Sequence, residues 1–189
     1  MKLRMPPYPD SVATGSYFYV QACHRKTAID AAISVICKTA EQEDAEFADA
    51  PVSLGPSGDM GEWVVESLLQ GAWMREYHEW EKATKAYFEE QHSRNGSAVK
   101  WKGKAAGVEG RTPSHMDRVK AQLALFSATV PPKILAAIDD TRCKVNTAKH
   151  KHADEQFVTE SEYMLFVKSV LNFWERMGEQ EEFMPPAAC

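Results

Sequence analysis

Aromatic and apolar residues recur at helical spacing between residues 61 and 91, and this run constrains the fold more than any other feature of the chain. Alternating steps of four and three residues place six side chains on one helical face: Leu69, Trp73, Glu76, Trp80, Ala83 and Tyr87. Such spacing is typical of a helix that packs one face into a bundle. The helix should end near Asn95 and Gly96, since glycine readily adopts the left-handed conformation that closes helices.

Proline and glycine divide the rest of the chain into four further helical stretches. The first covers residues 17–47. The third should begin with Thr112 as its N-cap and Pro113 in its first turn. The fourth follows a Pro-Pro pair, and the fifth opens with a capping box from Thr159 to Glu162. Five amphipathic helices joined by links predict an all-α fold, an antiparallel up-and-down helical bundle.

A length of 189 residues suits a single domain. We expect an N-terminal extension at 1–16, the bundle at 17–178 and a tail at 179–189. A Gly- and Lys-rich, aperiodic stretch at 93–112 predicts a mobile, exposed basic loop. Eight residues are expected to be buried together: Leu69, Trp73, Trp80, Ile138, Val145, Phe166, Val170 and Phe173.

The net charge of −5 is unevenly distributed. Residues 41–66 hold eight acids and no Lys or Arg, whereas residues 94–120 hold seven Lys or Arg against two acids. Such asymmetry indicates either a phosphate-facing surface or a solvated face.

The sequence lacks a signal peptide and a run long enough to span a membrane, so a cytoplasmic location is expected. The four cysteines form no CxxC pair, and no cofactor is expected.

Three polar residues of different chemistry recur every four positions in the fourth helix: Arg142, Asn146 and His150, here called the polar line. On a helix they share one face. Histidine can transfer a proton near neutral pH, and arginine can stabilise charge on a phosphate. The polar line is therefore chemically suited to phosphoryl chemistry, whereas composition alone favours the alternative, a solvated helix face.

The segment from Arg142 through Asn146 to Lys149 and His150 resembles the signature of the HEPN superfamily, although the gap between Arg142 and His150 is longer than usual. The stretch from Tyr77 to Glu81 is similar to the aromatic-and-acid stretch on an early helix of many such bundles. Many HEPN proteins are metal-independent ribonucleases of toxin–antitoxin and antiviral defence systems. The resemblance implies RNA cleavage through the ribose 2′-OH, and a homodimer with its cleft between two protomers.

Within that resemblance, His150 is the expected acid or base, Arg142 holds the phosphate, and Asn146 orients one of them. Nearby lysines would attract an RNA backbone without reading its sequence: Lys144, Lys149 and Lys151. Two other hypotheses remain open. The chain could be a non-catalytic helical module that binds a protein partner or antitoxin, or His150 and His152 could belong to a metal site.

Glu76 is an acid on the apolar seam of the second helix, so a bundle would bury it. A buried carboxylate needs a partner. The candidates are Arg142, Lys82 or a tyrosine hydroxyl, and the pairing could be structural or could tune a catalytic base.

Overall fold

The computed structural model describes residues 1–5, 11–47, 57–97, 101, 112–150 and 158–182, with the backbone alone at some helical positions. These residues form five helices and no strand, apart from one isolated bridge between Arg4 and Glu182. The helices are α1 (Ser11–Phe47), α2 (Ser57–Arg94), α3 (His115–Leu125), α4 (Pro132–His150) and α5 (Glu160–Gly178). The predicted all-α bundle is confirmed.

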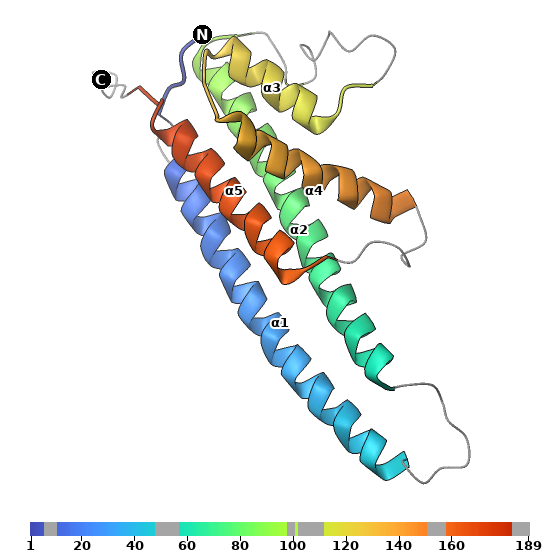
Figure 1. Ribbon diagram of the computed structural model, residues 1–189. Helices are drawn as coiled ribbons and strands as arrows, with labels where there is room; N and C mark the ends of the chain where they lie inside the picture. Colours follow the sequence, from blue (N-terminus) through green and yellow to red (C-terminus); the bar gives the residue numbers. More distant parts are fainter. Residues whose placement is uncertain (6–10, 48–56, 98–100, 102–111, 151–157, 183–189) are drawn as a thin grey trace.

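The two long helices, α1 and α2, each run along much of the length of the molecule (Figure 1). Helix α5 packs against α1, and α4 packs against α5 and α2. Helix α3 lies near the end of α2 (Figure 1). Within the described residues, no helix combines the length and the apolar character that crossing a bilayer requires.

The predicted core is present. All eight expected residues are buried, and seven of them belong to one continuous cluster, whereas Leu69 is buried outside it. Trp80 has no exposed surface and makes edge-to-face contact with Phe173 of α5 at a ring separation of 6.0 Å. The α2 seam is therefore the face on which the bundle is built.

Several predicted helix ends need correction. Helix α1 begins at Ser11, before the expected start at Tyr17. The N-cap of α3 is Ser114 and not Thr112, because Ser114 and Asp117 form a capping box with each other's backbone N–H groups. The capping box of Thr159 and Glu162 is confirmed at α5. Gly96 closes α2 with a φ of 63°, as expected.

The expectation of an exposed loop at 93–112 is wrong at Trp101, which is only 2% exposed. Its ring stacks on Phe88 of α2 at 5.9 Å and lies 5.1 Å from the ring of His115. The loop is therefore docked on the bundle at this residue. Mobility was predicted for the whole stretch, most of which lies outside the described residues.

The N-terminal residues are part of the fold. Leu3 is buried, and Gln91 of α2 bonds to both the backbone N–H and the carbonyl of Arg4 at 2.8 and 2.7 Å. The backbone of Glu182 pairs with Leu3 and Met5. Residues 1–5 thus lie between the end of α2 and the segment after α5 (Figure 1).

Helices α1 and α5 approach each other closely at two positions that glycine occupies. A Cβ at Gly15 would lie 2.5 Å from Cβ of Trp174, and one at Gly178 would lie 2.3 Å from a methyl group of Val12. Neither position has room for a methyl group. These two glycines set the distance between the helices.

We expect Gly15→Ala to lower the free energy of unfolding by about 1–3 kcal/mol, because the methyl group would collide with Trp174. Gly71 is the matched control, since it is exposed in α2 and a Cβ there meets nothing within 4 Å. Gly71→Ala should raise the unfolding free energy by about 0.5–1 kcal/mol through helix propensity. Denaturant unfolding measures both, and equal effects of the two substitutions would contradict the close approach.

Candidate functional site

Helix α4 carries the whole polar line. The backbones of Arg142, Asn146 and His150 all lie within its helical residues. Of the three side chains, the structure describes only that of Arg142. The side chains of Asn146, Lys149 and His150 lie outside the described part, as do Lys151 and His152 entirely.

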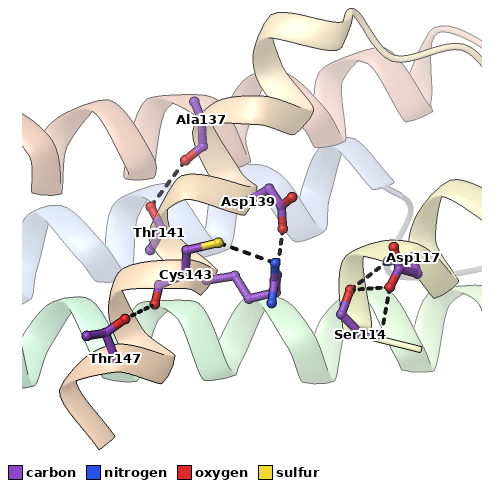
Figure 2. Close-up of polar contacts among 8 residues, drawn as sticks. Ser114, Asp117, Ala137, Asp139, Thr141, Cys143 and Thr147 are labelled. Atoms are coloured by element: carbon purple, nitrogen blue, oxygen red, sulfur yellow. Dashed lines mark hydrogen bonds and ion pairs between the residues drawn. The ribbon is translucent and has the colours of Figure 1, made fainter. Parts of the chain in front are cut away.

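The guanidinium of Arg142 is oriented by its own helix. Its Nε donates to Oδ1 of Asp139 at 2.5 Å, and its Nη2 donates to Sγ of Cys143 at 3.3 Å. Figure 2 shows Asp139 and Cys143 on neighbouring turns of α4. The bond to Asp139 raises the pKa of Arg142, so the cation is secure. A guanidinium has five N–H groups, so Arg142 keeps donors that these two bonds do not use. Its side chain is about one-fifth exposed.

One side chain of α2, Tyr77, lies within electrostatic range of this arginine. Burial and the charge of Glu81 raise the pKa of Tyr77, whereas Arg142 opposes that rise and Asp139 adds to it. The Tyr77 hydroxyl is buried and has no hydrogen-bond partner of normal geometry among the described residues. The structure thus brings together Tyr77 and Glu81 of α2 with Arg142 and Asp139 of α4.

A histidine on α3 that was not among the residues predicted from the sequence also belongs to this region. His115 follows the cap of α3, and its ring lies 5.2 Å from that of Trp80. Its electrostatic neighbours are Glu81 and Arg118. No local pattern reveals these contacts, because the residues of α2 that meet His115 lie about thirty positions earlier in the sequence.

The protonation state of His115 follows from its neighbours. Thr84 Oγ1 donates its hydrogen to the Trp80 carbonyl at 2.8 Å, so it accepts at its 2.8 Å contact with Nε2 of His115. The hydrogen of the neutral ring is therefore on Nε2, which leaves the lone pair on Nδ1. Burial lowers the pKa of His115 to about 4, so the ring is neutral at physiological pH.

The one predicted RNA-binding lysine whose side chain is described is engaged within the bundle. The Lys144 ammonium forms an ion pair with Glu162 of α5 and lies 5.7 Å from the centre of the Trp73 ring. This pair, with the hydrogen bonds of Thr159, lowers the pKa of Glu162. An RNA phosphate would have to compete with Glu162 for Lys144.

Glu76 has a partner that the sequence analysis did not consider. The carboxylate has no exposed surface, and Arg25 of α1 binds it with two donors, Nε and Nη2, the latter at 2.5 Å. The Tyr163 hydroxyl of α5 completes the site at 3.4 Å. Of the expected partners, a tyrosine hydroxyl is thus correct, whereas Arg142 and Lys82 bind Asp139 and Glu79 instead.

No metal centre can be assembled from the described side chains, since no group of three or more His, Cys, Asp and Glu is suitably placed. Cys23 and Cys143 are free thiols. The alternative metal pair, His150 and His152, lies outside the described side chains.

The depressed pKa of His115 makes stability depend on pH. Unfolding returns the pKa from about 4 to its ordinary 6.5, so the unfolded chain gains the proton first as the pH falls. Stability should decline between these two values, by up to about 3 kcal/mol. Urea unfolding at pH 7 and near pH 4.5 measures the loss. The variant His115→Gln, which retains an N–H donor for Thr84, should lose less unfolding free energy over this pH range. An equal loss in the variant and the unmodified protein would contradict this account.

Comparison with known proteins yields no match: no family model matches the chain, nor does a curated protein or a solved structure. Function must therefore be inferred from the side chains and their contacts. The region where α2 and α4 meet around Arg142 is the strongest candidate.

Proposed function

We propose that this protein is a metal-independent endoribonuclease of the HEPN type, and that the α4 face bearing Arg142 binds the scissile phosphate. One observation carries the proposal. The two segments that resemble HEPN proteins lie far apart in the sequence, yet Tyr77 lies within electrostatic range of Arg142 and Asp139 as well as of Glu81. The guanidinium of Arg142 has more N–H donors than its bonds to Asp139 and Cys143 use, and the remaining donors can bind an anion.

Each residue of the polar line takes part in the proposed reaction. His150 takes the proton of the ribose 2′-OH, and the 2′-oxygen then attacks the adjacent phosphorus. The bond from phosphorus to the 5′-oxygen breaks, and that oxygen takes up a proton from water or from the acid His150. The products are a 2′,3′-cyclic phosphate and a 5′-hydroxyl. Arg142 binds the non-bridging oxygens, and Asn146 orients the histidine or the phosphate.

The wider setting belongs to the same proposal. Lys144, Lys149 and Lys151 would attract the RNA backbone, an attraction that weakens as salt rises. A toxin–antitoxin or antiviral defence system, a cytoplasmic location and a homodimer are the circumstances in which such an enzyme would act.

A second candidate function is that of a non-catalytic module that binds a protein partner. It is favoured by apolar side chains that α1 exposes to solvent, among them Tyr17 and Val35, which are 69% and 64% exposed. Exposed apolar surface of this kind often marks an interface. The module would need no catalytic residue, so loss of the polar line would not affect it.

We expect the purified protein to cleave RNA in the presence of EDTA, with His150→Ala lowering the rate by roughly 10²–10⁴. Arg142→Ala should be comparably damaging. The fold should survive that change, because both described side-chain partners of Arg142 lie on its own helix. A gel assay that resolves cyclic-phosphate ends measures the reaction, and denaturant unfolding checks the fold.

Two residues supply matched controls. Lys133→Ala removes an exposed cation from the first turn of α4, and His152→Ala removes a histidine two positions from His150. Both should cleave at nearly the rate of the unmodified protein. Intact RNA with the unmodified protein, at every salt concentration tested, would refute the nuclease and favour the binding module.

A further inference from the structure

Helix α1 exposes a straight stripe of mostly apolar residues on the side away from the core. Steps of three and four residues connect its members, which here form the α1 outer stripe: Tyr17, Val20, His24, Ala28, Ala31 and Val35. All six are exposed, with Tyr17 at 69%, Val20 at 47% and Val35 at 64%. At 100° per residue these positions fall within one narrow sector of the helix, opposite the buried Phe18 and Ala22.

The bundle leaves this part of α1 short of neighbours. Helix α5 begins beside Lys26, whose ammonium lies 2.9 Å from a carboxylate oxygen of Glu160. Beyond that level α1 continues past the start of α5, alongside α2 (Figure 1). From Thr27 to Val35 no residue of α1 is buried, although Ile29 and Ile33 are half-buried. Apolar residues on a helix gain stability mainly by tertiary packing, and the exposed apolar residues of this segment gain little of it from the described part of the bundle.

We propose that the α1 outer stripe is a dimerisation surface, on which the α1 helix of a second copy packs antiparallel. The stripe is suited to a copy of itself. Val20, His24, Ala31 and Val35 are separated by steps of four, seven and four residues, which read the same in both directions along the helix. A two-fold axis near Thr27 and Ala28 then aligns these four residues with their own copies, as a two-fold interface requires, and places Ala28 opposite the partner's Thr27.

Side-chain size and charge agree with this register. Val20 lies opposite the partner's Val35, so that the larger apolar groups meet at both ends. His24 lies opposite the partner's Ala31, and the small residues at the centre allow the helices to approach closely. Lys38, which is exposed, lies opposite the partner's Tyr17, where an ammonium and an aromatic ring attract each other. The stripe contains no acidic residue, so no like-charged carboxylates oppose the pairing.

This dimer differs from the one that the family resemblance implies. Helices α1 and α4 pack on α5 and α2 from different sides (Figure 1). Pairing through α1 therefore leaves Arg142 of each protomer outside the interface, and no cleft is shared. The inference stands apart from the proposed nuclease, because association and cleavage are measured separately.

A charge-swap experiment on the full chain tests both the surface and the register. Val20→Glu and Val35→Lys should each weaken the dimer by about tenfold or more, since each change occurs twice in a two-fold interface. The double variant Val20→Glu/Val35→Lys should recover most of the association, because antiparallel pairing places each new carboxylate opposite a new ammonium. Within one chain these positions are about 22 Å apart along the helix, so they cannot pair with each other.

Sedimentation velocity over a concentration series measures the dissociation constant of each protein, and circular dichroism confirms that the helices remain. Ala136→Glu is the matched control, since it adds the same charge at an exposed position of α4 and should leave the dimer intact. A monomeric unmodified protein would overturn the proposal, as would equal weakening by Ala136→Glu. A double variant no better than the single ones would overturn the antiparallel register.

Discussion

A carboxylate without exposed surface lies in the middle of the α2 seam, and the packing of three helices depends on how its charge is balanced. Two donors of Arg25 bind Glu76 from α1, and the Tyr163 hydroxyl approaches it from α5. An uncompensated charge in this position would be strongly destabilising, so α1 must present Arg25 at this level of α2. The two helices cannot slide along each other without breaking the pair. The close contact of Gly15 with Trp174 then fixes α1 against α5.

The pairing of Glu76 with Arg25 also leaves Arg142 available for another role. Because Arg25 neutralises the buried acid, Arg142 is not needed for that purpose and is held by Asp139 on its own helix. Tyr77, the next residue of α2, lies within electrostatic range of Arg142, whereas Glu76 faces α1. The α2 helix thus separates a structural ion pair from the region where we propose that RNA binds. In this proposal, Arg25 stabilises the fold and Arg142 binds RNA.

The sequence predicted most of the fold, because helical periodicity and capping boxes are local patterns. The seam from Trp73 to Tyr87 and the cap at Thr159 are of this kind. The partner of Glu76 could not be predicted, since Arg25 is 51 residues away and nothing in its surroundings indicates the pairing. The docking of Trp101 within an aperiodic stretch was missed for the same reason. In the candidate site, local spacing pointed to Arg142 and the family resemblance pointed to the stretch from Tyr77 to Glu81, whereas the position of His115 depends on tertiary packing.

The most direct test of the central claim is a double-mutant cycle between Arg25 and Glu76, measured by denaturant unfolding. Arg25→Met alone should cost about 3–5 kcal/mol, because it leaves a buried carboxylate without its cation. The double variant Arg25→Met/Glu76→Met should be more stable than Arg25→Met, since it removes the unbalanced charge and keeps apolar volume. That outcome would show that the pair acts as a unit. Two single losses that simply add in the double variant would contradict the account.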